Sequence, residues 1–313
     1  MVKPRKPARG ERGEGGMIAR IAALAKVPRR AGLALGIGDD CAVYRPRGSP
    51  EELLFTTDML IEDRHFRRAT HGAEDVGWKA LARGLSDVAA MGGEPRFCLV
   101  SLALPPWADG RWVDGFYRGL LRLAGREKTT LAGGDLARAE KLMCDIVVCG
   151  AAPRGSALRR GGARAGDAVC VSGSLGASAL GVERGRGPAW KRHTRPEPRL
   201  ALGRFLRAKL GATAAMDLSD GLSLDLRRMC LASGLSAEIG DPPVFPGATM
   251  QQALHGGEDY ELLFTLPRAA QPPPEFEGLA LTRIGTMRRG QPGRVTWNGT
   301  PLPPLGFDHF RQR

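Results

Sequence analysis

Short apolar stretches that lead into glycine and aspartate recur along this chain, and this pattern constrains its fold most strongly. In the first, residues 35–40 read Leu-Gly-Ile-Gly-Asp-Asp and precede the apolar run 41–44, which predicts a strand. Glycine lets backbone approach a ligand closely, and adjacent aspartates repel each other unless a cation or hydrogen-bond donors lie between them. One such stretch alone is more often an ordinary polar turn. Its repetition predicts a site for a hard cation.

A set of aspartates lies at glycine-flanked turns or at the ends of predicted elements, where binding groups usually occur. The set is Asp40, Asp58, Asp87, Asp135, Asp217 and Asp220. No histidine or cysteine accompanies them at the spacing of a metal site, and ligand sets made only of oxygen select hard ions. Magnesium held by a few carboxylates usually coordinates substrate phosphates as well. We therefore expect several Mg²⁺ ions and chemistry on phosphate esters or anhydrides.

The apolar pattern predicts a helix over residues 75–93, with Asp87 in its last turns. The helix dipole disfavours a negative charge there by a few tenths to about 1 kcal/mol. Two explanations remain open: an ion pair with Arg83, one turn earlier, or a bound cation.

Thr56, Thr57 and Asp58 are expected at the end of a strand predicted over residues 51–60. Hydroxyls and a carboxylate in that position can share a metal or a phosphate, although a simple capping turn explains them about as well. His65 follows beside an aromatic residue, and a lone histidine in such a setting is more often structural than catalytic. Ser219 or Asp220 is a plausible N-cap for the helix that follows.

The chain has no P-loop motif and lacks the protein-kinase motif set. A triphosphate would therefore be held mainly through metal ions, with basic groups such as Arg160 assisting. If the acceptor is itself a phosphate, its oxygen is already anionic and needs no general base. Repulsion between two anions is then the main obstacle, and magnesium ions would relieve it.

Residues 1–16 are basic and rich in glycine and proline, and they predict a disordered tail without a signal peptide. We place a domain boundary near a predicted linker over 151–155, which gives an N-terminal domain of residues 17–152 and a C-terminal α+β domain of residues 153–313. No apolar run is long enough to span a bilayer, so we expect no membrane contact. The 6 cysteines form no Cys-x-x-Cys pair, which fits a reducing cytoplasm.

A series of motifs resembles the thiamine-monophosphate kinase family in order and spacing. They are Gly36-Ile-Gly-Asp-Asp-Cys-Ala, Thr56-Thr-Asp, His65-Phe66, Lys79-Ala-Leu-Ala with Leu85-Ser-Asp-Val-Ala-Ala-Met-Gly, Gly133-Gly-Asp, Asp217-Leu-Ser-Asp-Gly and Gly256-Gly-Glu-Asp-Tyr-Glu-Leu. The resemblance runs from about Ile18 to Phe310. It implies Mg²⁺-assisted, ATP-dependent phosphorylation of thiamine monophosphate to thiamine diphosphate by direct in-line transfer, the final step of thiamine diphosphate biosynthesis.

The same resemblance implies the two-domain α+β fold of aminoimidazole ribonucleotide synthetase. In that fold the N-terminal domain binds metal and ATP and pairs in a homodimer. The metal ligands that it implies are Asp40, Thr56, Thr57, Asp58, Asp87, Asp135, Asp217 and Asp220, with Asp135, Asp217 and Asp220 as the catalytic set. The implied ATP contacts are Gly134, Asp135, Arg160 and Ser219. The implied contacts with thiamine monophosphate are His65, Glu258 and Phe307.

Two kinds of alternative remain at this point. Other ATP-using members of the same fold act on a purine precursor, on selenide or in hydrogenase maturation. The chain has neither the reactive N-terminal cysteine nor the C-terminal cysteine expected of the last two, and it ends Arg311-Gln312-Arg313. The net charge of +13 raises the possibility of nucleic-acid binding. Few aromatic residues, and none interleaved with basic ones, argue against it, so we expect no nucleic-acid partner.

Overall fold

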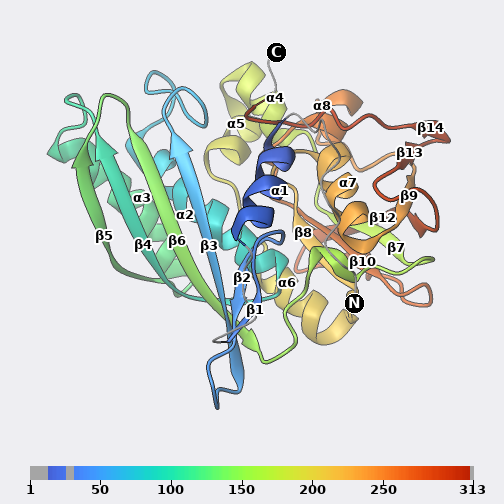
Figure 1. The fold of residues 1–313 in the computed structure, drawn as a ribbon. Helices are drawn as coiled ribbons and strands as arrows, with labels where there is room; N and C mark the ends of the chain where they lie inside the picture. The colour runs from blue at the N-terminus through green and yellow to red at the C-terminus, as the bar shows by residue number, and fades with distance from the viewer. Residues whose placement is uncertain (1–12, 26–31, 311–313) are drawn as a thin grey trace.

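Two β-sheets form the framework of the protein, and helices pack around them in an α+β arrangement (Figure 1). This computed structural model describes residues 13–25 and 32–310. The last strand of the first sheet ends at Pro153, and the second sheet begins at Ala168. The chain therefore completes one sheet before it starts the other.

The first sheet has 6 strands in the order β1-β2-β3-β6-β4-β5, and all neighbours are antiparallel except β4 and β5. Its strands are β1 (Leu33–Leu35), β2 (Ala42–Tyr44), β3 (Glu51–Ile61), β4 (Glu94–Leu104), β5 (Thr130–Arg138) and β6 (Met143–Pro153). Residues of β3 alternate between buried and more exposed positions, as expected for a sheet covered on one face.

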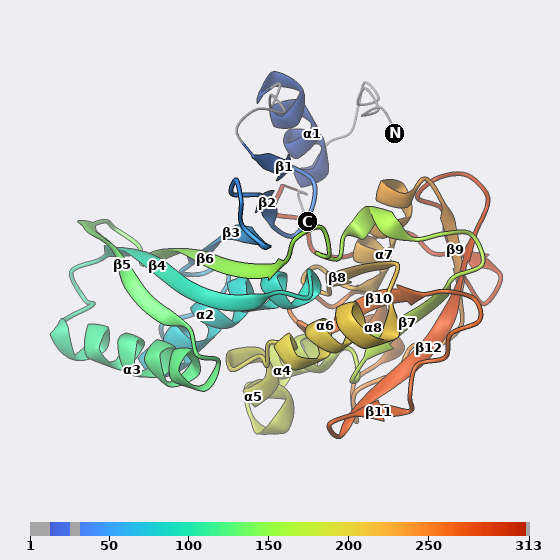
Figure 2. The ribbon, with the colours of Figure 1, turned by 90° about the horizontal axis from the view of Figure 1, so that it is seen from below.

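Helices of the N-terminal half are α1 (Glu14–Ala25), α2 (Ala73–Ala90) and α3 (Gly110–Arg126). Figure 2 shows α2 and α3 on the same side of the first sheet, while no helix of the described residues covers the opposite face of β3, β6, β4 and β5. Most residues of α2 are buried because the helix packs between the sheet, α3 and the C-terminal half. Asp109 caps α3 by accepting a hydrogen bond from the backbone N of Trp112.

The second sheet has 8 strands, with the order β14-β13-β9-β12-β7-β10-β8 and β11 added beside β12. They are β7 (Ala168–Ser172), β8 (Ala214–Asp217), β9 (Ser236–Ile239), β10 (Leu262–Leu266), β11 (Glu275–Phe276), β12 (Leu279–Arg288), β13 (Val295–Trp297) and β14 (Thr300–Pro301). Its helices are η1 (Arg160–Gly162), α4 (Ala177–Arg184), α5 (Gly187–Thr194), α6 (Leu200–Phe205), η2 (Leu206–Leu210), α7 (Leu222–Ser233) and α8 (Met250–His255).

A close contact between α6 and α2 joins the two halves. Gly203 of α6 lies against the backbone of Ala89, and a Cβ added at Gly203 would stand only 1.9 Å from the Ala89 carbonyl oxygen. Only glycine permits this approach. One buried hydrophobic cluster accordingly contains residues of both halves. The contact also brings β8, which ends in Asp217, against α2, which carries Asp87.

Several predicted boundaries are wrong. Thr56, Thr57 and Asp58 lie within β3 and not at its end, because the strand continues to Ile61. Asp135 likewise lies inside β5, which continues to Arg138. The N-cap of α7 is Gly221, without a side-chain cap, so neither Ser219 nor Asp220 has that role.

The two ends of the N-terminal half also differ from the prediction. Helix α1 begins at Glu14, inside the predicted tail of residues 1–16; residues 1–12 of that tail lie outside the described residues. Strand β6 continues to Pro153, through part of the predicted linker, and the division into two domains at this point stays a prediction. Within residues 13–25 and 32–310, no helix is long and apolar enough to cross a membrane.

Candidate active site

Asp40, Asp87 and Asp217 converge where the two halves meet. One carboxylate oxygen from each lies within 4.8 Å of the other two. Asp40 follows the glycine turn after β1, Asp87 projects from the last turns of α2, and Asp217 ends β8. The sequence placed all three among the metal ligands, and the structure brings them together over long sequence separations.

The burial of this three-aspartate cluster makes its negative charges unfavourable without a cation. Burial, followed by the charge of Asp58, raises the pKa of Asp87 well above its ordinary value. Burial, followed by the charge of Asp40, does the same to the pKa of Asp217. The Oδ2 atom of Asp40 is buried and has no hydrogen-bond partner in the described part of the chain. An oxygen-only donor set with an unpartnered, buried oxygen fits a hard divalent cation.

Hydroxyl groups orient two of these carboxylates. The Thr56 hydroxyl donates a hydrogen bond to Oδ2 of Asp87 at 2.5 Å, and the Ser86 hydroxyl donates to Oδ2 of Asp217 at 2.8 Å. Thr57 faces the other side of β3 and donates instead to Asp145 at 2.7 Å. The structure therefore brings Thr56 to the cluster but not the side chain of Thr57.

Arg160, a predicted ATP contact, lies directly beside the cluster. Its guanidinium forms an ion pair with Asp40, in which Nε donates to Oδ1 at 3.1 Å. The backbone N of Arg160 donates to Asp39 at 3.2 Å. Burial and the neighbouring Asp40 raise the pKa of Asp39 to about 6. A strongly basic group and the acidic cluster thus share one wall of the site.

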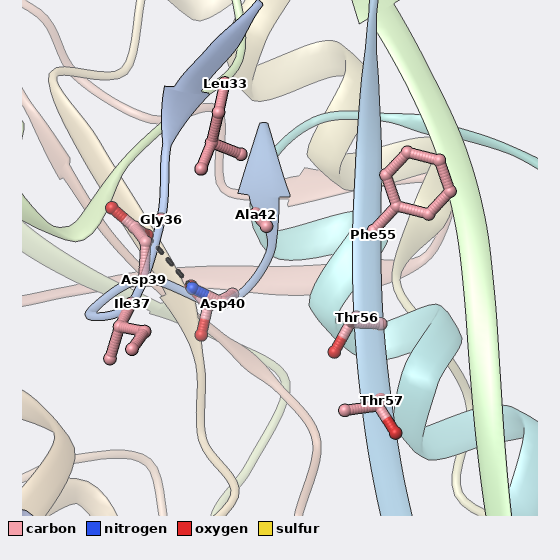
Figure 3. A pocket seen from close by; sticks show the side chains of 9 residues that line it. All are labelled: Leu33, Gly36, Ile37, Asp39, Asp40, Ala42, Phe55, Thr56 and Thr57. Atoms are coloured by element: carbon pink, nitrogen blue, oxygen red, sulfur yellow. Dashed lines mark hydrogen bonds between the residues drawn. The ribbon is translucent and has the colours of Figure 1, made fainter. Parts of the chain in front are cut away.

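A pocket of about 400 Å³ opens next to Asp40 and Thr56. Figure 3 shows its lining residues, which come from β1, β2, β3 and the glycine turn between the first two strands. Leu33, Ile37 and Phe55 contribute apolar surface, and Asp39 and Asp40 contribute charge at one side. The pocket therefore combines an apolar wall with the edge of a cation site.

Asp58 and Asp220 lie next to the cluster but have arginine partners. Asp58 pairs with Arg83 at 2.9 Å, so the proposed pair between Arg83 and Asp87 is wrong. The Arg83 side chain extends from α2 toward β3, so its ion-pair partner is Asp58 on the strand and not Asp87 one turn later on the helix. Asp220 pairs with Arg228, and it is close enough to Asp58 to raise the pKa of that carboxyl group.

Gly134 and Asp135 lie away from the three-aspartate cluster within one chain. Along one row of the first sheet, Asp58 pairs with Ile146, Ile146 with Val100, and Val100 with Gly134. Three strand spacings separate Gly134 from Asp58, or about 14 Å. Asp135 belongs to the neighbouring row, and its side chain therefore faces the helix-free side of the sheet. Its predicted roles in metal and ATP binding stay predictions.

The predicted substrate residues gather near Asp220. His65 and Phe307 both contact the ring of His309, with ring centroids 5.1 and 4.7 Å apart. The backbone N of Phe307 donates to the carbonyl of Asp220 at 2.9 Å, which anchors this C-terminal segment beside the site. Glu258 lies close enough to His65 to influence the pKa of the ring. Ser219 joins this region through its carbonyl, which accepts from the backbone N of Glu258 at 2.7 Å.

Glu258 is held by a fully buried lysine, which belongs to one of the family motifs but has no role predicted from the sequence. Lys79 Nζ donates to Glu258 at 3.0 Å and to the carbonyl of His65 at 3.1 Å. Burial alone would raise the pKa of Glu258, but the charge of Lys79, followed by that of Arg83, lowers it to about 2. Glu258 is therefore a permanent anion at neutral pH.

The histidines next to this ion pair are neutral. Burial is the main cause that lowers the pKa of His65 to about 3 and that of His193 to about 3, and the charge of Lys79 adds to it in both. His193 Nδ1 lies 2.8 Å from the Ser178 hydroxyl, and its Nε2 lies 3.3 Å from Nε2 of His71. These contacts give His193 a structural role, and the lone His65 is suited to packing or hydrogen bonding and not to proton transfer at neutral pH.

Replacing His193 by glutamine is expected to make the protein less sensitive to acid. A histidine whose folded pKa is lowered loses its contribution to stability as the pH falls below its unfolded value of about 6.5. Between pH 7 and pH 5 this one group should cost the wild type up to about 2 kcal/mol of unfolding free energy. Urea unfolding of both proteins at the two pH values checks this. Equal losses in the wild type and the variant would contradict it.

Several site residues were missed by the sequence reading, and their signals differ. His309 lies only two positions after Phe307, and so the aromatic C-terminal segment itself could have indicated it. Asp225 is buried and accepts hydrogen bonds from the backbone N of Asp220 and from Arg228. Its position in the first turn of α7 looks like ordinary helix chemistry, and nothing in the sequence alone marks it as a support for Asp220.

Comparisons with known proteins agree with this geometry. Residues 38–153 match the family described as AIR synthase related protein, N-terminal domain. Thiamine-monophosphate kinase from Bacillus subtilis is 35% identical over 88% of this chain and 94% of its own length. The Escherichia coli K12 enzyme of the same name is 35% identical over 90% and 93%.

Solved structures give the same result. The crystal structure of thiamine monophosphate kinase from Aquifex aeolicus matches with a TM-score of 0.79 and 33% identity, covering 92% of this chain and 98% of the other. The structure described as AaThiL complexed with AMPPCP and TMP matches with a TM-score of 0.84 and 34% identity, covering 95% and 97%. A hydrogenase maturation protein HypE, 20% identical with a TM-score of 0.66, shares the fold alone. The predicted α+β fold is thus confirmed, the pairing in a homodimer stays a prediction, and the chain belongs to the thiamine-monophosphate kinase family.

Proposed function

We propose that this protein transfers the γ-phosphoryl group of ATP to thiamine monophosphate and so produces thiamine diphosphate and ADP. The observation that carries the proposal is the position of the three-aspartate cluster. Asp40 of the cluster also lines the pocket, and Arg83, which pairs with Asp58 beside the cluster, lies close enough to Glu258 to influence its pKa. A relative of 34% identity was solved in complex with AMPPCP and TMP, which supports the same pair of substrates here.

The Mg²⁺ ions expected for this reaction would be held chiefly by Asp40, Asp87 and Asp217. When bound, Mg²⁺ would offset the negative charge of the phosphate oxygens and favour the in-line approach of two anions. Thr56 and Ser86 hold two of the carboxylates in place through hydroxyl hydrogen bonds. Arg160 adds a positive charge beside Asp40, where the triphosphate would lie. Apolar residues of the pocket, such as Phe55, suit the adenine ring.

On the acceptor side, the charges suit thiamine monophosphate. Glu258 keeps its negative charge at neutral pH and would attract the cationic thiazolium ring. His65, His309 and Phe307 offer aromatic surface for the rings of the substrate. No general base is needed, because the attacking phosphate oxygen is already ionised. The low pKa of His65 is consistent with this.

The test is to incubate the purified protein with Mg²⁺, ATP and thiamine monophosphate and to separate the products by chromatography. Thiamine diphosphate and ADP should appear in equal amounts, and a chelator should stop the reaction. ADP release driven by a different phosphate acceptor, with no thiamine diphosphate formed, would assign the cluster to other chemistry and leave His65, Glu258 and Phe307 without the proposed substrate.

We also propose that two copies pair through the helix-free face of the first sheet. On this face Met59 is 52% exposed and Leu99 is 36% exposed, in a region that carries no covering helix (Figure 2). Apolar residues along an uncovered sheet are typical of an interface. Asp135 shares this face and would lie at or near the pairing surface.

We also propose a cytoplasmic location, which the 6 buried, unpaired cysteines support.

Replacing both Met59 and Leu99 by glutamate is expected to convert the dimer to a monomer. Charges introduced opposite each other in an apolar interface lose hydration without gaining partners. Light scattering should give about twice the chain mass of 33.5 kDa for the wild type and about that mass for the double variant. Leu121→Glu is the control, because Leu121 is exposed on α3, on the covered side of the sheet. A wild type of single-chain mass would overturn the pairing.

A further inference from the structure

Arg83 places a permanent positive charge inside the site. It projects from α2, one turn before Asp87, and its side chain is only 12% exposed. Its Nη2 donates to Oδ1 of Asp58 and its Nη1 donates to the carbonyl of Met59, both at 2.9 Å. The guanidinium is thus fixed at two points of β3.

The surroundings of Arg83 are those expected for a cation site. Although burial lowers the pKa of a guanidinium, the charges of Asp58, Glu258 and Asp87 and the phenol of Tyr260 raise that of Arg83 above its usual value. The Nε atom is buried and has no hydrogen-bond partner among the residues that the structure describes. The side chain is therefore retained at this position mainly by charge.

The ion pair of Asp58 with Arg83 competes with coordination of a divalent ion by the same carboxylate. A Mg²⁺ ion lies about 2.1 Å from a carboxylate oxygen, and the guanidinium nitrogen lies 2.9 Å from Oδ1. If a divalent ion bound the same Oδ1 atom, the two cations would stand within about 5 Å of each other, where repulsion in a partly buried site is strong. The ion pair thus competes with the metal role that the sequence gave to Asp58.

We propose that Arg83 takes the place of one divalent ion in this protein, by neutralising Asp58, and that the metal ions bind at Asp40, Asp87 and Asp217 instead. This inference rests on the proposed phosphoryl-transfer function and on its metal cluster. Without Arg83, the Asp58 carboxylate would be free to bind a divalent ion, with the carboxylates of Asp220 and Asp145 nearby. Arg83 then acts through Asp58: it supplies the positive charge that a divalent ion would otherwise supply at that carboxylate.

The test counts bound ions directly and does not depend on turnover. Mn²⁺ bound per chain is measured from the loss of the free Mn²⁺ signal in electron paramagnetic resonance, with AMPPCP present. Arg83→Gln should bind one ion more than the wild type. Asp58→Asn should bind as many as the wild type, and the double variant should return to the wild-type number. Arg83→Lys keeps the charge and should also match the wild type.

Arg195→Met is the matched control for loss of an ion-paired arginine. Arg195 is half-buried and pairs with Asp75, also on α2, but it lies outside the proposed metal cluster, so the ion count should not change. Thermal unfolding of each variant verifies that it is folded. The inference is overturned if Asp58→Asn loses an ion while Arg83 is present, or if Arg83→Gln gains none. Thiamine diphosphate formation by the wild type is measured separately, so failure of the inference is distinguishable from failure of the proposed function.

Discussion

Asp217→Asn is expected to reduce thiamine diphosphate formation by about 10²- to 10³-fold, the scale seen when one group that stabilises transition-state charge is removed. The side chain keeps its shape and can still accept the hydrogen bond from Ser86. The substitution therefore lowers the rate by removing one negative charge from the three-aspartate cluster, in which one carboxylate oxygen of each residue lies within 4.8 Å of the others. Initial rates at saturating Mg²⁺ and substrates measure it.

Although Asp217→Asn should lose activity, it should not lose stability relative to the wild type when divalent ions are removed. The folded pKa of Asp217 is raised, first by burial and then by Asp40. Folding is thus disfavoured increasingly as the pH rises above the ordinary carboxyl value of about 3.9, and the penalty is present at pH 8. Asparagine carries no such penalty. In chelator at pH 8 the variant should unfold at the same temperature as the wild type or higher, and Mg²⁺ should stabilise it less.

Asp114→Asn serves as the control for this prediction, because Asp114 is an exposed carboxylate on α3. It should retain wild-type activity and the full stabilisation by Mg²⁺. Wild-type rates in Asp217→Asn would remove Asp217 from the metal ligands, and the cluster would then have to be explained by protonation of its buried carboxyl groups.

Lys79→Met is expected to have the second large effect, on both stability and substrate binding. The fully buried Lys79 is the closest cation to Glu258, and methionine leaves that carboxylate without it. Breaking a buried ion pair costs about 3–5 kcal/mol. Because Glu258 is 24% exposed, we expect the lower end of that range, about 3 kcal/mol, in urea unfolding at pH 7.

The same substitution should weaken the binding of thiamine monophosphate. Without Lys79, Glu258 loses the ion pair that lowers its pKa most and that holds its carboxylate in place. KM for thiamine monophosphate should then rise more than KM for ATP. Combining Lys79→Met with Glu258→Gln should restore part of the stability, since no unpaired charge remains, but not the affinity.

Lys141→Met is the matched control, because Lys141 forms an ion pair with Asp63 at the surface. Such exposed pairs contribute about 0–1 kcal/mol, so this variant should be nearly as stable as the wild type. If Lys79→Met were as stable as Lys141→Met, Glu258 would be solvated well enough not to need its partner, and the charge argument for this residue would be wrong.

Local patterns in the sequence predict much of the framework. The strand predicted over residues 51–60 forms as β3, and the helix predicted over residues 75–93 forms as α2 with the expected apolar face. The assignment of Asp40, Asp87 and Asp217 as metal ligands rests on the recurring aspartates at turns and element ends and on the resemblance to the family, and the structure brings the three together. Glycine favours turns, and the spacing of apolar residues distinguishes strands from helices, so both kinds of element can be predicted from short segments of sequence.

Contacts between distant elements could not be predicted in the same way. Thr56, Asp58 and Arg83 make their partners across the interface between β3 and α2, so the sequence suggested a strand end and an i,i+4 pair instead. A polar residue in mid-strand resembles one at a strand end until the packed helix is known. Lys79 is similar, since a lysine in an apolar helix normally indicates a solvated position and not a buried ion pair.

The contact of Gly203 with the backbone of Ala89 has a consequence for how the molecule unfolds. No side chain can slide or adapt at this point, because the two backbones touch directly. The two halves should therefore melt in a single cooperative transition, even though each sheet is continuous in sequence. Any ligand that binds Asp87 and Asp217 together then raises the melting temperature of the whole chain. A break in the backbone between Pro153 and Ala168 should lower the stability of both halves at once.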